Sequence, residues 1–297
     1  MIQTRSEGAA DGRPPLIQAR KRRQGAAKRL ADSAGYLVVI VLALFCLLPF
    51  AWLFEGAFDP KASLYLQMPL GLTLDNFGRA FNDSGALQLL TNSLIMALGA
   101  VAVVVVCASL AGYTLSRLRF RFKRTLMYGI LLAQLIPVTA TIVPIYSIFI
   151  DLHLVNTYRG MILILATYQL PLSLWIMKSF FDAVPTEIEE AAWTDGAGRI
   201  RTIYSIIVPL ALPGVSAAAL FTFIGAWGEF TLPLILLSSQ DKLPLSLGIY
   251  RSYQSYYLVD YGQLTAMSLL YLAPSLLFFI ITRRYLTRVT VVGATTG

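Results

Sequence analysis

Histidine and cysteine are almost absent from this sequence. The chain has one histidine, His153, and two cysteines, Cys46 and Cys107, which lie in separate apolar runs without a Cys-x-x-Cys spacing. These few side chains favour neither a metal site nor a disulfide framework. A single histidine also leaves no Ser/His/Asp set and no His-rich cluster for a membrane enzyme. We therefore predict no catalytic residues, no metal and no cofactor bound by this chain.

Charged residues are also scarce, and apolar residues take their place. Only 13% of the residues are charged and 57% are hydrophobic, whereas soluble globular domains average about 25% and about 45–50%. Such a composition is typical of an integral membrane protein. The formal net charge is +8, but the basic residues lie beside apolar runs and no soluble domain is expected to carry a binding face. No nucleic-acid partner is therefore predicted.

Six apolar runs are long enough to cross a bilayer, which takes about 20 residues in a helix. They cover approximately residues 34–54, 93–115, 125–150, 160–181, 214–237 and 264–282. Polar, basic residues precede the first run and no small-residue cleavage pattern follows it, so we expect this run to remain as a span. The sequence thus predicts an all-α membrane protein with six transmembrane helices.

The density of basic residues alternates from one connecting segment to the next. Nineteen of the 24 Lys and Arg residues lie near the N-terminus, after the second and fourth runs, or near the C-terminus. Because positively charged loops remain cytoplasmic, we expect both termini in the cytoplasm, and this orientation requires an even number of spans. The expected organisation is a basic arm at 1–33, a transmembrane domain at 34–282 and a cytoplasmic tail at 283–297.

One of these expected cytoplasmic loops, residues 182–209, is too polar to span and has the pattern of a helical hairpin. Thr186 and Glu189 have the spacing of a capping box, which predicts a helix start. Gly196 suits a helix end that requires positive φ, and a second helical stretch is expected from about Arg199 to Pro209. Small alanines and acidic groups could contact another protein. On these grounds alone, an ordinary amphipathic hairpin at the interface remains equally possible.

The same loop resembles the EAA motif of permeases of binding-protein-dependent ABC importers. That pattern is Glu-Ala-Ala, three positions, Gly, nine positions, Ile, one position, Leu and Pro, and the loop matches it with Glu190, Ala191, Ala192, Gly196, Ile206, Val208 and Pro209. Val208 replaces the usual leucine. Other stretches are similar to the carbohydrate branch, including MalG-type maltose permease subunits: LDNF at 74–77, IPVTATIVPIY at 136–146 and WGEF at 227–230. The WGEF stretch has Gly228 where asparagine is usual, and the closing GATTG at 293–297 lacks the usual lysine.

This resemblance implies a type I ABC importer permease fold in the bacterial cytoplasmic (inner) membrane. A cytoplasmic ABC ATPase dimer would dock on the loop, with coupling residues Glu189, Glu190, Ala191, Ala192, Asp195, Gly196, Ile206 and Pro209. The ATPase would use ATP and Mg, since this chain has no Gly-x-x-x-x-Gly-Lys-Ser/Thr sequence for phosphate binding. The other implied partners are a second permease subunit in a heterodimer, an extracytoplasmic solute-binding protein, the lipid bilayer and a sugar substrate.

Polar groups within the apolar runs are candidates for a substrate pathway. Glu229 would lie within the fifth run, where a charged group is costly, and could accept hydrogen bonds from sugar hydroxyls beside Trp227 and Phe230. An internally bonded glutamate is an equally good interpretation. Prolines interrupt the third and fourth runs, where Gln134 and Gln169 could bind freed backbone groups. Simple kinks would explain these prolines as well.

Two alternative functions remain open. A secondary transporter driven by an ion gradient would ordinarily show several intramembrane carboxylates, histidines or arginines, and the runs offer little beyond Glu229. The same ABC machinery could instead carry a glycerol phosphate, although no arginine lies in mid-run to bind the phosphate. The lack of such an arginine favours a neutral sugar, and the resemblance implies a disaccharide or an oligosaccharide as the expected substrate.

Overall fold

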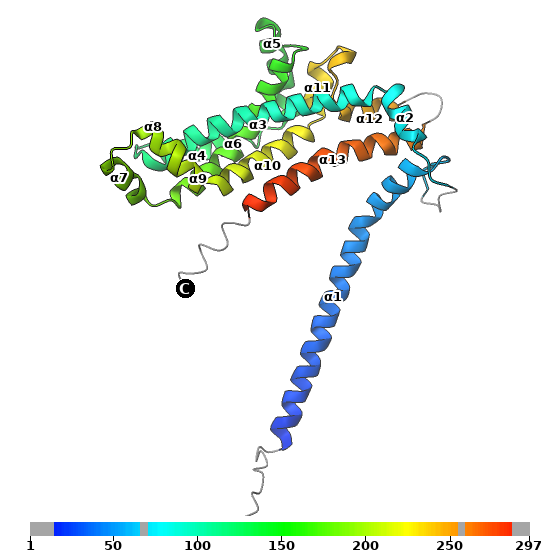
Figure 1. Cartoon of the computed structure of the whole chain (residues 1–297), viewed down its shortest axis with the longest axis horizontal. Coiled ribbons are helices and arrows are strands. Elements are labelled where there is room, and N and C mark those ends of the chain that lie inside the picture. Colours follow the sequence, from blue (N-terminus) through cyan, green and yellow to red (C-terminus); the bar gives the residue numbers. More distant parts are fainter. Residues whose placement is uncertain (1–14, 66–70, 255–258, 287–297) are drawn as a thin grey trace, which may run out of the picture. The chain divides into compact units, whose positions relative to one another are not determined.

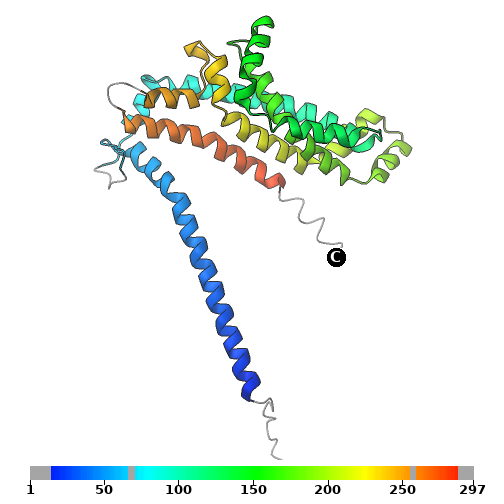
Figure 2. The ribbon, with the colours of Figure 1, turned by 180° about the vertical axis from the view of Figure 1, so that it is seen from behind.

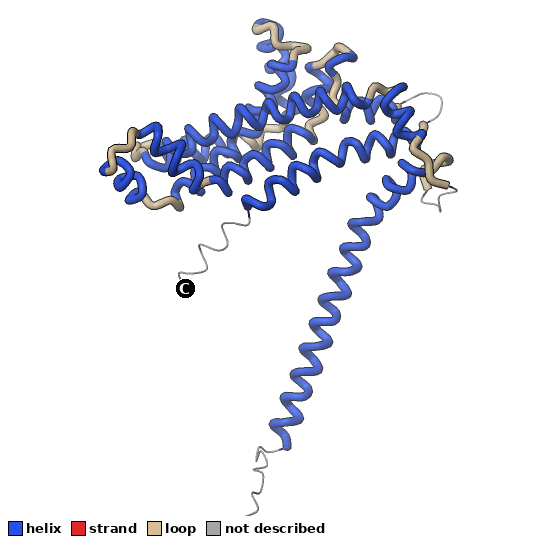
Figure 3. The backbone as a smooth tube through the Cα atoms, in the orientation of Figure 1, coloured by secondary structure: helices blue, strands red, loops and turns tan. Residues whose placement is uncertain are grey.

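The computed structural model describes residues 15–65, 71–254 and 259–286, with side chains from residue 32 onward. Within these ranges all regular secondary structure is helical, loops connect the helices, and no strand is present (Figure 3). The basic residues Arg5 and Arg13 and the closing 293–297 stretch lie outside the described residues.

The first apolar run lies in a single long helix, α1 (Pro15–Phe58), of 44 residues. Its apolar part, Asp32–Phe58, is long enough to cross a membrane. The helix therefore begins before the predicted start at residue 34 and ends after the predicted end at residue 54. Because of this extension, the apolar part of the helix also contains Glu55, a carboxylate that lies outside the predicted run.

The core of residues 53–286 is formed by α3 (Ala86–Arg117), α6 (Tyr158–Asp182) and α10 (Leu212–Trp227), with α13 (Tyr261–Leu286) against α10 (Figures 1 and 2). A stripe of small residues on α3 is fully buried: Ala97, Ala100, Val104 and Ala108. Small residues allow close approach of helix backbones within membranes. Gly112 is an example of such close approach to a neighbouring backbone, since a Cβ there would lie 3.0 Å from the backbone nitrogen of Lys178.

Two of the predicted spans are not continuous helices. The third run is divided into α4 (Lys123–Ala133) and α5 (Val138–Asp151), which meet at 96° with Pro137 as the N-cap of α5. In contrast, Pro144 lies inside α5 and Pro171 inside α6, and both helices continue through them. Proline thus causes a break at one of these three positions.

The fifth run also differs from its prediction as one helix over 214–237. The helix α10 ends at Trp227, and a separate short helix, α11 (Thr231–Leu236), follows. At its start, α10 meets the preceding helical segment Arg199–Leu210 at 74°. The described residues contain four helices long and apolar enough to span a membrane, or up to six if each bent pair is one span.

Short helices occupy the two ends of the bundle (Figures 1 and 2). One end carries α2 (Asp75–Asn82) and α12 (Leu245–Tyr253), next to the one-turn 3₁₀ segment Gln240–Lys242. The other end carries α7 (Thr186–Thr194), α8 (Arg199–Thr202), a π-helical turn at Ile203–Ile207 and α9 (Val208–Leu210).

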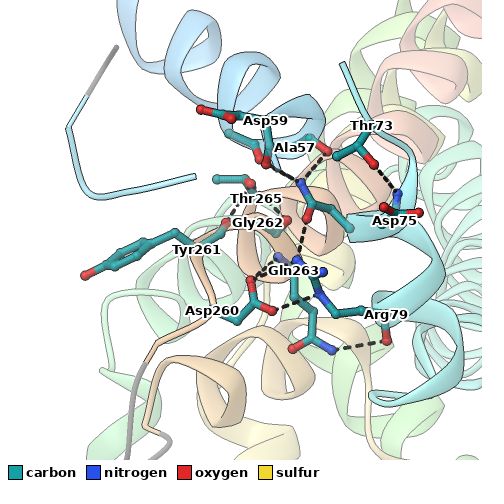
Figure 4. A network of polar contacts seen from close by, with 12 residues as sticks. Ala57, Asp59, Thr73, Asp75, Arg79, Asp260, Tyr261, Gly262, Gln263 and Thr265 are labelled. Carbon is teal, nitrogen blue, oxygen red and sulfur yellow. Dashed lines mark hydrogen bonds and ion pairs between the residues drawn. The ribbon is translucent and has the colours of Figure 1, made fainter. Parts of the chain in front are cut away.

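A polar network at the α2 end explains the LDNF stretch (Figure 4). Asn76 is fully buried, and its Nδ2 donates to the carbonyl oxygens of Gly56, Ala57 and Asp59 at 3.2, 3.0 and 2.9 Å. Its Oδ1 accepts from Arg79 at 2.5 Å, and Arg79 pairs with Asp260 at 3.0 Å. Asn76 therefore satisfies carbonyls that a helix end leaves without helical partners.

Candidate functional site

The 182–209 loop folds into a helical hairpin, as its pattern predicted. Helix α7 ends in a Schellman motif, in which the amide of Ala197 donates to the carbonyl of Ala192 at 2.9 Å and that of Gly196 to the carbonyl of Trp193 at 3.0 Å. Gly196 has φ +85°, which confirms the predicted positive φ. The second helical stretch runs from Arg199 to Leu210, close to the predicted extent.

The predicted capping box is wrong. The N-cap of α7 is Pro185, without a side-chain cap, and Thr186 is already the first helical residue. Glu189 is only 2% exposed and turns toward α3. Its Oε1 accepts from Arg117 Nε at 2.6 Å, and its Oε2 accepts from the Tyr113 hydroxyl at 2.8 Å. This carboxylate has an ion pair inside the chain and is not presented at the surface.

Arg117 holds the hairpin against two helices at once. Besides Glu189, its guanidinium donates to the carbonyl oxygens of Phe181, at 3.0 Å, and Val184, at 3.0 Å. These residues lie at the end of α6 and in the turn before α7. A charge-assisted network of this kind is stronger than neutral hydrogen bonds, so α7 has a fixed position relative to α3 and α6.

The outward face of the hairpin has a different character. Five of the eight predicted coupling residues are exposed there, namely Glu190, Ala191, Asp195, Gly196 and Pro209, whereas Ile206 is half-buried and Glu189 and Ala192 are buried. Large side chains beside them are also exposed: Trp193 at 41%, Ile200 at 73% and Tyr204 at 63%.

A cavity of about 400 Å³ is lined by residues of the hairpin and of the end of α3. Its lining includes Glu190, Trp193 and Arg199, and the Arg199 guanidinium lies 5.7 Å from the centre of the Trp193 ring. The large exposed side chains of the hairpin thus form an apolar patch with charged groups at its edge, which is the composition of a protein-binding surface.

Trp227, the first of the predicted pathway residues, packs inside the chain. It is 5% exposed and stacks with Phe223 and Tyr271, each at 5.3 Å between ring centres. Its Nε1 donates to the carbonyl of Tyr271, at 3.1 Å, and the Tyr271 hydroxyl donates back to the carbonyl of Trp227, at 2.6 Å. The indole therefore contributes to the contact between α10 and α13 and offers little surface to a sugar.

Glu229 lies in the turn between α10 and α11 and is half-buried. Its Oε1 accepts hydrogen bonds from the amides of Thr231 and Leu232 at 2.8 and 3.0 Å, so it satisfies donors at the start of α11. This is the internally bonded arrangement that the sequence left open. The neighbouring Phe230 meets the Tyr250 ring edge-on at 5.1 Å.

The two glutamines lie at helix contacts. Gln134 is the C-cap of α4, and its Nε2 donates to the carbonyl of Tyr168 in α6 at 3.4 Å. Gln169 packs against Gly225 of α10, where a Cβ would lie 2.1 Å from the glutamine Nε2. Both therefore connect neighbouring helices. Among the described residues, no group of three or more His, Cys, Asp or Glu side chains could hold a metal ion.

Comparison with known proteins shows the family to which this chain belongs. The sequence profile described as "Binding-protein-dependent transport system inner membrane component" matches residues 104–291, which include the whole hairpin. The chain belongs to this family. Like other members, it is a multi-pass membrane protein, and the segment that carries the EAA pattern forms the hairpin between its central helices.

Relatives of the chain include the diacetylchitobiose uptake system permease protein NgcG of Streptomyces coelicolor. The two sequences are 31% identical over 256 residues, and the match covers 84% of each chain. The maltodextrin transport system permease protein MdxG of Bacillus subtilis is 31% identical over 225 residues, 75% of this chain and 81% of that protein. The trehalose/maltose permease protein MalG of Thermococcus litoralis is 30% identical, over 87% of this chain and 94% of that protein.

A solved structure shares the permease fold. The bacterial ABC transporter that imports the acidic polysaccharide alginate matches with a TM-score of 0.76 at 18% identity, over 87% of this chain and 97% of that chain. This likeness shows the importer permease fold for the described helices.

Proposed function

We propose that this chain is a permease subunit of an ATP-driven importer that carries a disaccharide or an oligosaccharide through the bacterial inner membrane. The observation that carries this proposal is the hairpin: its exposed face holds the motif residues Glu190 and Ala191, while Arg117 fixes its other face to the bundle. Such a surface suits a cytoplasmic ATPase dimer, which would supply ATP hydrolysis with Mg.

Each part of the hairpin has a role in this proposal. The carboxylates of Glu190 and Asp195 would pair with basic groups of the ATPase, and the small Ala191 would let the two backbones approach. Trp193, Ile200 and Tyr204 would provide apolar contact area around them. Glu189 would act inside the chain and hold α7 in place.

The remaining partners follow from the family. The permease subunit would pair with a second permease subunit, and an extracytoplasmic binding protein would deliver the sugar to the pathway between them. This chain would itself be non-catalytic. The sugar assignment rests on the relatives, whose names refer to diacetylchitobiose, maltodextrin, trehalose and maltose.

Uptake measurements in cells would test this function. The chain, expressed with its neighbouring gene products, is expected to support uptake of labelled maltodextrin or diacetylchitobiose that stops when ATP is depleted. Uptake should continue when an ionophore collapses the ion gradients while ATP remains available. The opposite pattern, loss with the ionophore and persistence without ATP, would favour a secondary transporter and contradict the proposal.

A further inference from the structure

A second cavity at the hairpin end of the bundle is unrelated to the motif. It has a volume of about 300 Å³ and lies where α4 begins beside the last turns of α6, with a lining of Lys123, Arg124, Met127, Tyr128, Trp175 and Lys178. Half of these residues are cationic and two are amphipathic aromatics. This combination differs from the small apolar residues of α3 that are buried in the core.

The cavity has an excess of positive charge. Lys178 is partly neutralised by Asp182, which lies one turn later on α6 and forms an ion pair with it. Lys123 Nζ donates to the carbonyl of Leu118 at 3.4 Å and is also attracted by the Asp182 carboxylate, and the described part of the structure shows no partner for the exposed Arg124. Three cationic side chains thus face one carboxylate, which leaves an excess of two positive charges for a ligand.

Aromatic side chains form the wall of the cavity. The Tyr128 and Trp175 rings lie 5.9 Å apart at 47°, and Trp175 Nε1 donates to the carbonyl of Met127 at 3.1 Å, which fixes the indole. Tyrosine and tryptophan are enriched at the level of lipid headgroups because one end of each is apolar and the other polar. The wall of this cavity thus has the chemistry of the membrane interface.

The position of the cavity along the bundle agrees with that level. Lys123 opens α4 shortly after the end of α3 at Arg117, and Arg117 binds Glu189 of the hairpin. The cavity and the hairpin therefore share one end of the bundle, which the basic loops predict to be cytoplasmic. The cytoplasmic leaflet carries anionic lipids, and basic pockets between helices on that side bind phosphate headgroups.

We propose that this cavity binds the phosphate headgroup of an anionic phospholipid from the cytoplasmic leaflet. Lys123 and Arg124 would contact the phosphate oxygens, and Tyr128 and Trp175 would pack beside the glycerol backbone. Basic residues that only set the orientation of the chain in the membrane need to lie in the loop, but they do not need a cavity lined by aromatic rings. The ligand chemistry is a phosphate ester, which a lipid and free phosphate share, so the test separates these two sources.

The test compares two double variants of the same basic loop. In one, Lys123→Ala is combined with Arg124→Ala, which removes two of the three cationic side chains of the cavity. In the matched control, Arg119→Ala is combined with Arg121→Ala; both side chains are exposed and lie outside the cavity lining. The full chain, purified with its co-purifying subunits in nanodiscs of phosphatidylcholine and phosphatidylglycerol, is analysed by native mass spectrometry for retained lipid.

The cavity variant is expected to lose preference for phosphatidylglycerol over phosphatidylcholine by about thirtyfold, and the control is expected to lose little. A third variant, Asp182→Asn, frees Lys178 and should raise the preference, a gain that misfolding would not produce. An equal loss in both double variants, or no loss in either, would overturn the proposal. Displacement of the lipid by millimolar inorganic phosphate would assign the cavity to free phosphate and also overturn it.

Discussion

Adjacent glutamates of the hairpin should respond differently to the same small change. Glu189→Gln removes the negative charge that pairs with the Arg117 guanidinium. Both side chains are largely buried, with 3% of Glu189 and 15% of Arg117 exposed. Removing one partner of a buried ion pair costs about 3–5 kcal/mol. Arg117 keeps its hydrogen bonds to two backbone carbonyls, and glutamine can still accept one hydrogen bond. We therefore expect the free energy of unfolding to fall by about 3 kcal/mol, the lower end of that range.

The neighbouring change supplies the matched control. Glu190 is exposed, so Glu190→Gln should alter the free energy of unfolding by less than about 0.5 kcal/mol. It should instead weaken retention of the ATPase if this carboxylate pairs with basic groups there. Replacing both partners of the buried pair, Arg117→Met with Glu189→Leu, removes the uncompensated charge but also the donors to the Phe181 and Val184 carbonyls, so it should restore no more than part of the stability.

Two measurements on each variant separate fold from docking. The melting temperature of the purified chain in detergent reports stability, and a pull-down with co-expressed gene products reports the retained ATPase. Glu189→Gln is expected to lower the melting temperature, whereas Glu190→Gln is expected to lower ATPase retention alone. Loss of the ATPase from Glu189→Gln at an unchanged melting temperature would show that Glu189 contacts the partner and would refute the buried-pair reasoning.

Three further outcomes test other features. Gly196→Val forces a β-branched residue to φ +85°, which costs about 1–3 kcal/mol; sugar uptake should be lost while membrane fractionation shows normal insertion. Glu229→Gln keeps an oxygen that can accept both amides and should leave uptake unchanged, whereas Glu229→Ala should reduce it; a loss in the glutamine variant would indicate that the charge contacts substrate or partner. Asn76→Ala leaves buried carbonyls without donors and should lower stability by about 1–3 kcal/mol, seen as a lower melting temperature.

The hairpin was predictable because its signals are local. Positive φ at Gly196 follows from a helix end within a few residues of sequence, and the spacing of the motif lies in one segment. The partner of Glu189 could not be predicted in the same way, because Arg117 is 72 residues away in sequence. A weak signal existed: Glu189 precedes the buried Ala192 by three residues and so shares its helix face.

The broken helices show the other limit of sequence reasoning. Pro137, Pro144 and Pro171 give the same local signal, yet only Pro137 begins a new helix direction. Pro171 lies in α6, which packs against both α3 and α10, and neighbouring helices can compensate for a missing hydrogen bond. The surroundings of Pro137 are more open, with Leu135 75% and Ile136 52% exposed. Tertiary packing, which the local pattern does not contain, thus separates Pro171 from Pro137; it does not explain Pro144, which is exposed within the continuous α5.

The three attachments of the Arg117 side chain have a mechanical consequence. The link between α6 and α7 is short, residues 183–185, and its Val184 carbonyl is one of the groups that the guanidinium binds. Since Glu189 and Phe181 bind the same guanidinium, the link has no slack with which to absorb a displacement of α7. We expect a push on the hairpin to tilt α3 and α6 together as one stiff body, so that a small movement at one end becomes a larger one at the far end of two long helices.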